Sequence, residues 1–242
     1  MREIRVYTNQ PLSSGGEITL ETQASRHLAT VLRLKPGTPV TLFNGQGGEY
    51  SASLVSCGKQ VRAAVHDFVD SERESPLNIY LGIGLSRGDR MDMVIQKATE
   101  LGVTAITPLY TERTEVKLKG DRAEKKLRHW QQVVASACEQ CHRNRLPEIS
   151  APVSLSEWIE QIEVEEKLVL HHRSEQTLSQ LQEQQPASVA LLIGPEGGLS
   201  EQEINLAEKE GFSGLKLGPR VLRTETAPLT AISVLQTLWG DF

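Results

Sequence analysis

The stretch Leu191-Leu192-Ile193-Gly194-Pro195-Glu196-Gly197-Gly198-Leu199-Ser200 decides the fold class of this chain. Its apolar run predicts a strand over Val189–Gly194, and Ser200 with Glu203 has the spacing of a capping box, which predicts a helix over Glu201–Glu210. A second loop follows the same order of apolar run, glycine and helix, and it reads Leu217-Gly218-Pro219-Arg220-Val221-Leu222-Arg223-Thr224-Glu225-Thr226-Ala227. Two such units predict parallel strands whose loops meet at one sheet edge, where open α/β sheets bind ligands.

Neither loop has the pattern of a common nucleotide site. The chain has no Gly-Lys-Ser/Thr in these loops, which excludes a P-loop, and Gly194-Pro195-Glu196-Gly197-Gly198 lacks the G-x-G-x-x-G spacing of dinucleotide folds. A loop with Pro and Glu and no nearby Lys suits a neutral or cationic ligand held by backbone groups. The alternative is that both loops are tight turns that only connect strands to helices.

Strands and helices alternate over the rest of the C-terminal region, which predicts an α/β domain with a parallel sheet. Strands are expected at Asn78–Leu85, Ala105–Tyr110, Glu166–His171, Val189–Gly194 and Leu215–Gly218, and helices at Met91–Leu101, Arg122–Cys141, Glu201–Glu210 and Leu229–Trp239.

The N-terminal region has a different pattern, because residues 1–70 are dense in short β patterns separated by glycine turns. Strands are expected at Ile4–Thr8, Glu17–Leu20, Val40–Phe43, Tyr50–Ser56 and Val61–Val69, with one helix over Thr22–Leu34. Several short strands in a small space predict a compact barrel. The polar residues 71–76 end in Pro76 and read as a linker, so residues 77–242 form the second domain.

Composition places the chain among soluble globular proteins. It has 242 residues, 38% hydrophobic and 24% charged, and three cysteines without an export signal favour the cytoplasm. The net charge of −5 argues mildly against a nucleic-acid partner. However, residues 113–145 hold nine Lys/Arg and four Asp/Glu, a local +5, and an RNA site needs only a local basic surface. The alternative is an ordinary solvated face.

The two loops resemble those of the SPOUT methyltransferases, in particular the members that methylate N3 of a uridine in small-subunit ribosomal RNA. The similarity extends over nearly the whole chain and includes Arg73-Glu74-Ser75-Pro76-Leu77, Ser86-Arg87-Gly88-Asp89-Arg90-Met91, Gln96-Lys97-Ala98-Thr99-Glu100-Leu101-Gly102-Val103, Thr107-Pro108-Leu109 and Cys138-Glu139-Gln140-Cys141-His142-Arg143-Asn144-Arg145. The resemblance implies a deep trefoil knot in the C-terminal domain and a PUA-like, RNA-binding barrel before it.

The resemblance also implies a cofactor, S-adenosylmethionine, and no metal. The residues implied to enclose the cofactor are Leu170, His171, Ile193, Gly194, Pro195, Glu196, Gly197, Gly198, Leu217, Gly218, Val221 and Leu222. They follow the ends of three predicted strands, which a parallel sheet would bring to one edge.

The acceptor poses a separate problem, because N3 of uracil carries a proton and lies on the pairing edge of the base. Arg223 follows the cofactor loop and is expected to stabilise negative charge on uracil O2 or O4. Glu196 and Glu225 are candidate proton acceptors, and Thr226 is a candidate donor to a carbonyl. For Glu225 and Thr226 the alternative is a role in capping the last helix, and for Arg223 it is an ion pair with Glu196.

RNA contacts are expected from both domains. The resemblance places Glu139, Gln140, Arg143 and Asn144 near the substrate base and phosphates, with a solvated helix end as the alternative. Arg5, Arg26 and Arg33 are candidates for phosphate contacts in the barrel, or ordinary surface residues. The Cys138-x-x-Cys141-His142 pattern resembles a haem-attachment motif, but it falls in a predicted helix and lacks a fourth zinc ligand.

The last helix predicts a homodimer, because Leu229, Ile232, Leu235 and Trp239 share a face, with Val234 and Leu238 nearby. An entirely intramolecular role for that face is the alternative. Small-subunit ribosomal RNA in a pre-assembled subunit is the expected substrate. Two other functions stay open from the residues alone: a non-catalytic RNA-binding ribosome assembly factor, and a dinucleotide-dependent oxidoreductase, which the missing G-x-G-x-x-G disfavours.

Overall fold

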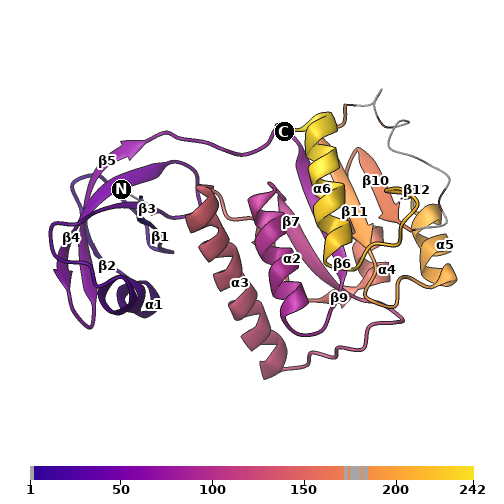
Figure 1. Cartoon of the computed structure of the whole chain (residues 1–242), viewed down its shortest axis with the longest axis horizontal. Helices are drawn as coiled ribbons and strands as arrows, with labels where there is room; N and C mark the ends of the chain where they lie inside the picture. Colours follow the sequence, from indigo (N-terminus) through magenta and orange to yellow (C-terminus); the bar gives the residue numbers. More distant parts are fainter. Residues whose placement is uncertain (1–2, 172–173, 175–180, 182–184) are drawn as a thin grey trace. The chain divides into compact units, whose positions relative to one another are not determined.

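The structure, a computed structural model, describes residues 3–171, 174, 181 and 185–242 and divides the chain into two compact units (Figure 1). The first unit contains Met1–Glu74 and Ala135–Leu146, and the second contains Ser75–Val134 and Pro147–Phe242. The segment 135–146 therefore belongs with the N-terminal residues in space, whereas the sequence pattern assigned it to the C-terminal domain.

The first unit is built on a five-stranded sheet with the order β1-β3-β4-β5-β2. β1 and β3 pair in parallel, and the other neighbours pair in antiparallel. Each strand overlaps one that the sequence predicts. The bounds are β1 Arg5–Tyr7, β2 Glu17–Thr19, β3 Pro39–Phe43, β4 Glu49–Cys57 and β5 Val61–Val69.

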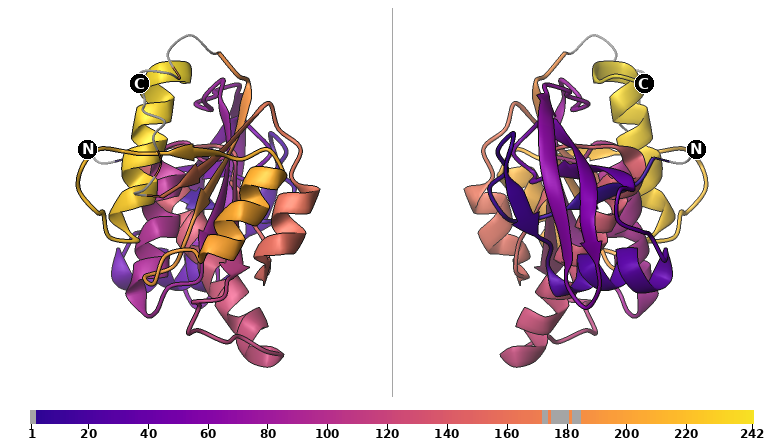
Figure 2. Two further views of the ribbon diagram at one scale, coloured as in Figure 1. Left: turned by 90° about the vertical axis from the view of Figure 1, so that its right-hand side faces the viewer. Right: turned by 90° about the vertical axis from the view of Figure 1, so that its left-hand side faces the viewer.

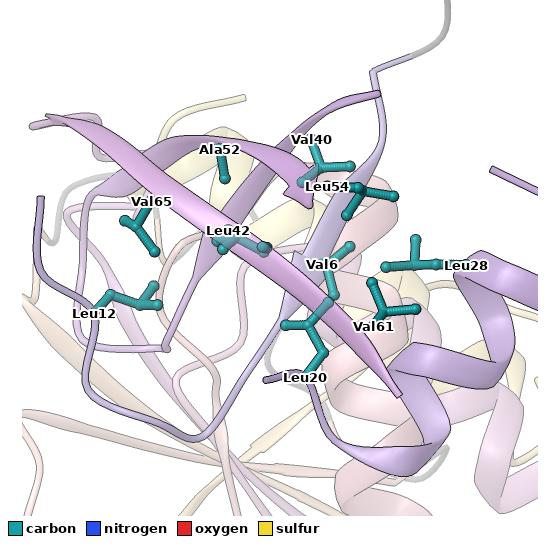
Figure 3. Packing of buried hydrophobic residues seen from close by; sticks show 11 residues of the cluster. Val6, Leu12, Leu20, Leu28, Val40, Leu42, Ala52, Leu54, Val61 and Val65 are labelled. Atoms are coloured by element: carbon teal, nitrogen blue, oxygen red, sulfur yellow. The ribbon is translucent and has the colours of Figure 1, made fainter. Parts of the chain in front are cut away.

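The core of this unit lies between the curved sheet and a short helical segment, as Figure 3 shows. Alternate residues of the strands point into it, including Val40 and Leu42 of β3 and Val61, Ala63 and Val65 of β5. Leu28 closes the core from the helical side and is fully buried.

The predicted helix over Thr22–Leu34 is present in a different form. An α-helix, α1, covers Thr22–Arg26, and a π-helical turn, η1, continues over His27–Val31. In that turn the backbone N–H of Leu32 donates to the carbonyl of His27, five residues back. Arg33 then adopts a left-handed φ of 53°, which ends the helical segment.

The second unit contains the predicted parallel sheet, with the strand order β12-β10-β11-β6-β7-β8 and with β9 pairing β7. Every strand pair in it is parallel. The bounds are β6 Asn78–Gly84, β7 Ala105–Tyr110, β8 Glu148–Ile149, β9 Val153–Ser154, β10 Glu166–Leu170, β11 Ser188–Ile193 and β12 Ser213–Leu215.

Helices cover both faces of this sheet, so the unit has three layers. Figure 2 shows α6 on one side of the sheet and α4 and α5 on the other. On the α4 and α5 side, Trp158 and Phe212 pack over strand residues such as Leu192. The helices are α2 Asp89–Glu100, α3 Asp121–Cys141, α4 Leu155–Gln161, α5 Glu201–Lys209 and α6 Thr226–Trp239, and the part of α3 from Ala135 on belongs to the first unit.

Three short elements are absent from the sequence-based prediction: α4, β8 and β9. The signal for α4 was available, because Ser154 caps the helix by accepting from the backbone N–H of Glu157 at 3.2 Å. β12 ends at Leu215, so Leu217 and Gly218 lie in the loop after it rather than in the strand. Among the described residues, no helix combines the length and apolar character needed to cross a membrane.

Candidate active site

A cavity of about 890 Å³ opens at the carboxyl ends of β10, β11 and β12. These three strands are neighbours in the sheet, so the loops that follow them meet at one edge. The apolar part of its lining includes the strand ends Leu170, Ile193 and Leu215. The two glycine-rich loops form the walls, as their positions in the sequence predict.

All twelve residues that the sequence analysis assigns to the cofactor line this one cavity. They come from the end of β10, the loop after β11 and the loop after β12: Leu170, His171, Ile193, Gly194, Pro195, Glu196, Gly197, Gly198, Leu217, Gly218, Val221 and Leu222. The structure thus brings together residues that are up to 52 positions apart in the chain, from 170 to 222.

Glycines allow the loop after β11 to fold closely onto the sheet. A Cβ on Gly194 would lie 2.8 Å from the backbone nitrogen of Leu199, so a side chain there would force the loop apart. A Cβ on Gly84, at the end of β6, would collide with the backbone nitrogen of Pro195. The turn closes with a hydrogen bond from the Gly198 N–H to the Pro195 carbonyl at 2.8 Å. Ser200 and Glu203 form the predicted capping box at the start of α5.

Glu196 lies in this loop and is held as an anion. Arg90 Nη1 donates to Glu196 Oε1 at 2.9 Å, and the backbone N–H of Arg87 donates to the same oxygen at 3.2 Å. Burial would raise the pKa of Glu196, but hydrogen bonds from its own backbone N–H, from the Arg87 N–H and from Arg90 lower it below its ordinary value. This carboxylate is therefore a weak proton acceptor.

The other residues proposed for chemistry are distributed differently. Arg223 and Glu225 line the cavity, whereas Thr226 is exposed and does not line it. Glu225 occupies the N-cap position of α6 without a side-chain capping bond. Instead, the backbone N–H groups of Thr226 and Ala227 both donate to the Arg223 carbonyl at 2.9 Å, which fixes the backbone of Arg223 at the start of α6.

The alternative ion pair between Arg223 and Glu196 is not formed. Glu196 pairs with Arg90 instead, and the ion pairs found among the described residues do not include Arg223. The exposed guanidinium of Arg223 is therefore available to a bound substrate.

The charged residues of the cavity wall that were not singled out from the sequence include Arg90, Glu112 and Arg113. Arg90 belongs to the first turn of α2, after β6, and the other two follow β7. A signal existed, because charged residues directly after two predicted parallel strands face the same sheet edge as the glycine loops.

In the first unit, the structure buries three of the residues expected to contact RNA. The side chain of Arg5 is 1% exposed, pairs with Glu49 and donates to Asn144 Oδ1. Asn144 itself is fully buried and donates to the Ser71 carbonyl at 2.8 Å. Arg5 is thus neither a surface residue nor a surface phosphate ligand in this structure, contrary to expectation. Its partners lie far away in the sequence.

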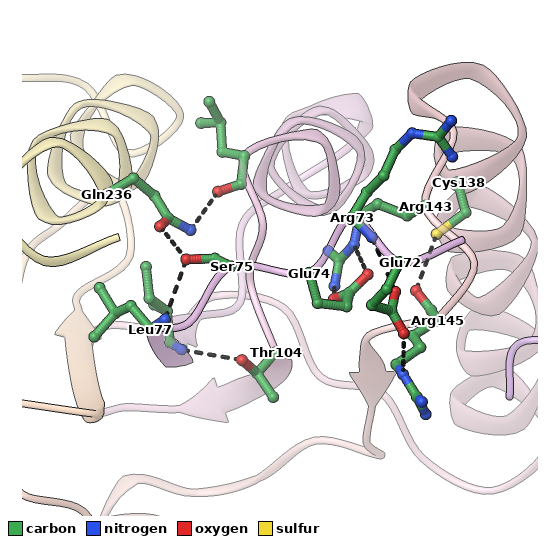
Figure 4. A network of polar contacts seen from close by, with 12 residues as sticks. Glu72, Arg73, Glu74, Ser75, Leu77, Thr104, Cys138, Arg143, Arg145 and Gln236 are labelled. Atoms are coloured by element: carbon green, nitrogen blue, oxygen red, sulfur yellow. Dashed lines mark hydrogen bonds and ion pairs between the residues drawn. The ribbon is translucent and has the colours of Figure 1, made fainter. Parts of the chain in front are cut away.

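Arg143 belongs to the same buried polar region, which includes the predicted linker (Figure 4). Its guanidinium pairs with Glu74, and the side chain is 5% exposed. Arg145 pairs with Glu72 at 2.6 Å in a similar way but stays exposed. Two residues of the predicted linker, Glu72 and Glu74, are therefore held against the segment 142–145 by charge pairs.

The remaining RNA candidates differ in exposure. Arg26, Arg33 and Gln140 are exposed. Glu139 is half-buried and accepts from the backbone N–H of Tyr7 at 2.9 Å, and burial raises the pKa of its carboxyl. The structure thus directs the carboxylate of Glu139 toward the backbone of β1.

The first cysteine of the pair on α3, Cys138, is buried and held as a neutral thiol. A hydrogen bond with Cys141 and burial raise the pKa of the Cys138 thiol strongly, which disfavours the thiolate that a metal would need. Within the described part of the chain, no three His, Cys, Asp or Glu side chains gather closely enough to hold a metal ion.

Comparisons with known proteins fit this architecture. A model of an RNA methyltransferase domain matches residues 73–236, and a model of an RNA methyltransferase PUA domain matches residues 20–61. Ribosomal RNA small subunit methyltransferase E from Buchnera aphidicola (Schizaphis graminum) is 37% identical, over 98% of this chain and 97% of that protein. The Bacillus subtilis protein of the same name is 32% identical, over 97% and 96%.

Solved structures agree as well. Ribosomal RNA small subunit methyltransferase E from Neisseria gonorrhoeae, bound to S-adenosyl methionine, is 40% identical with a TM-score of 0.92, and each chain is covered completely. A Legionella pneumophila protein solved with the bound cofactor SAM is 44% identical with a TM-score of 0.96, again over the whole of both chains. Since two domain models and full-length relatives match this one chain, it belongs to the family of ribosomal RNA small subunit methyltransferase E.

Proposed function

We propose that this protein transfers a methyl group from S-adenosylmethionine to N3 of a uridine in small-subunit ribosomal RNA. Family membership supports the methyltransferase activity and the class of RNA. The observation that carries the proposal is the single cavity that all twelve expected cofactor residues line. The choice of uridine N3 rests on the resemblance of the two loops.

The cavity residues suit S-adenosylmethionine. The strand ends Leu170, Ile193 and Leu215 offer apolar surface for a planar ring, and the loops offer backbone N–H and C=O groups for its edges. Gly218 has a φ of 123° and no atom within 4 Å of its Cβ position, so the backbone stays open where a ligand would approach. When bound, the cofactor supplies a methyl group already activated by a sulfonium.

Arg223 is the residue best placed to act on the acceptor. Its backbone is fixed at the start of α6, its side chain lines the cavity, and no ion pair found among the described residues engages it. A guanidinium beside uracil O2 or O4 stabilises the negative charge that develops as N3 loses its proton. Glu225 is the better of the two carboxylate candidates for receiving that proton, because Glu196 is held by Arg90.

The active protein is proposed to be a homodimer that acts on RNA in a pre-assembled subunit. Of the apolar residues on α6, Ile232 and Leu235 are fully buried within the chain, so part of this face serves the intramolecular core. Leu229, Val234 and Leu238 are only half-buried and can serve an interface. Light scattering at micromolar concentration tests this, and a monomer would reject it.

Three expectations stay predictions: the trefoil knot of the second unit, the domain limits at 1–70, 71–76 and 77–242, and the cytoplasmic location.

The second candidate function, an assembly factor without turnover, is distinguished from the methyltransferase by two measurements. Isothermal calorimetry with S-adenosylmethionine and mapping of methylated nucleotides in ribosomal RNA treated with the purified protein test both steps. Cofactor binding without methylation of either free RNA or assembled subunits would favour the assembly factor.

A further inference from the structure

A second cavity, of about 400 Å³, lies beside the first at the same edge of the parallel sheet. It is formed by the residues that follow β6, β7 and β11, which are neighbours in the sheet order. The two cavities share Arg90, Glu112, Arg113, Glu196 and Gly197 in their walls. A molecule in the second cavity would therefore lie next to one in the first.

Three arginines converge on this second cavity, and two of them have weakly held guanidinium groups. Arg113 Nη1 donates to the Gly197 carbonyl at 2.8 Å, a neutral acceptor, and the ion pairs among the described residues leave it without a carboxylate. Arg87 pairs with Glu115, but their side chains are 66% and 64% exposed. Because an exposed ion pair contributes little, Arg87 can exchange its partner for a stronger one at small cost.

The third arginine, Arg90, is occupied by Glu196, which neutralises that carboxylate within the wall. The cavity thus offers two exchangeable planar donor groups next to the neutralised carboxylate of Glu196, and its other acidic residues are Glu115, the partner of Arg87, and Glu112. Guanidinium groups match the geometry of phosphate oxygens and bind them through two parallel hydrogen bonds.

Resting on the proposed function, we infer that the second cavity is a phosphate subsite for the RNA strand, in which Arg113 and Arg87 hold a backbone phosphate adjacent to the acceptor nucleotide. The subsite fixes the strand so that its base can enter the neighbouring cavity. Glu115 occupies Arg87 in the free protein and releases it when the phosphate arrives.

The chain provides a matched control for this inference. Arg128 and Glu124 form an ion pair on α3 with side chains 60% and 70% exposed, much like Arg87 and Glu115, and neither residue lines a cavity described above. Replacing the arginine of either pair changes the net charge of the protein by the same amount, and so does replacing the glutamate of either pair. Only the Arg87 pair should affect a local subsite.

The test uses the full-length protein and a fluorescein-labelled single-stranded oligouridylate, with fluorescence anisotropy measured over a range of salt concentrations. Arg87→Ala should weaken binding about five- to tenfold at low salt and reduce the slope of log K against log salt by about 0.7, the value for one single-strand phosphate contact. Glu115→Gln should strengthen binding about two- to threefold. Arg128→Ala and Glu124→Gln should change affinity less than twofold.

Arg113→Ala should weaken RNA binding in the same way, and its affinity for S-adenosylmethionine is measured in parallel because Arg113 contacts Gly197. Equal salt slopes for Arg87→Ala and Arg128→Ala would overturn the subsite and indicate diffuse electrostatic attraction. Failure of the wild-type protein to bind S-adenosylmethionine or to methylate ribosomal RNA would instead overturn the proposed function, so the two failures are distinguishable.

Discussion

Arg90, in the first turn of α2, holds the carboxylate of Glu196, in the loop after β11, at 2.9 Å. The contact joins an element that follows β6 to the proposed cofactor loop, 106 positions further along the chain. It keeps Glu196 ionised, since the hydrogen bonds to this carboxylate outweigh burial and lower its pKa. The contact therefore argues for a role of Glu196 in shaping the loop rather than in accepting the uracil proton.

Glu196→Gln should accordingly lower affinity for S-adenosylmethionine several-fold while reducing the single-turnover rate less than tenfold. The glutamine keeps the shape of the side chain but loses the ionic attraction to Arg90. Calorimetry and single-turnover assays at saturating cofactor separate the two effects. A rate loss of a hundredfold or more would instead indicate that Glu196 acts as the general base.

The lowered pKa of Glu196 also predicts how the stability difference between the wild type and Glu196→Gln changes with pH. Because the pKa of Glu196 is below its ordinary value of 4.5, its ionic contribution to stability is present above pH 4.5 and is lost as the pH falls through the lower folded-state pKa. The melting temperatures of the wild type and of Glu196→Gln should therefore converge as the pH falls below about 4.5. A constant difference at acid pH would contradict the proposed ionisation.

Arg223→Ala should lose about a hundredfold to a thousandfold in turnover, which is typical for removal of one preorganised donor to a developing anion. Its melting temperature and cofactor affinity should stay near wild type, because no ion pair of Arg223 is found among the described residues and its backbone, not its side chain, anchors α6. Arg223→Lys should recover only part of the rate, since a point charge does not reproduce a planar fork. Parallel loss of stability in the Ala variant would indicate a structural role instead.

The features that the sequence predicted best are local or strictly periodic. The capping box of Ser200 and Glu203 lies within four residues, and the glycine loops follow strands whose alternation fixes their place at the sheet edge. The cavity could therefore be predicted before any coordinates existed. Its charged wall could be predicted only in part, because Arg90 and Arg113 follow predicted strands but their place beside the loop after β11 depends on the order of β6, β7 and β11.

The buried charges of the first unit were mispredicted for the same reason. The residues near Arg5 in the sequence do not show that its side chain pairs with Glu49, which lies 44 positions away. In the same way, nothing near Arg143 shows that it pairs with Glu74, 69 positions away. An isolated arginine in a β pattern reads as a surface residue, since arginine is rarely buried without a partner. Such pairings depend on tertiary structure.

Arg5→Ala should destabilise the protein by about 3 kcal/mol, because it leaves the Glu49 carboxylate, 14% exposed, without its buried partner. Urea unfolding followed by circular dichroism measures this. The pKa of Glu49 is lowered, as the bonds from Arg5 outweigh burial, so the stabilisation is present above pH 4.5 and should fade below it. Arg26→Ala, at an exposed position, is the control and should leave stability unchanged within about 0.5 kcal/mol.

Gly84→Ala should impair cofactor binding although Gly84 itself does not line the cavity. The new Cβ would collide with the backbone nitrogen of Pro195, and because this neighbour is backbone, the loop after β11 must move. We expect affinity for S-adenosylmethionine to fall at least about tenfold, since displacement of the loop shifts the groups that contact the ligand together. Gly58→Ala is the matched control, because its Cβ would meet no atom closer than 3.9 Å. Calorimetry that gave equal affinities for both variants would show that the close approach of Gly84 to Pro195 does not shape the site.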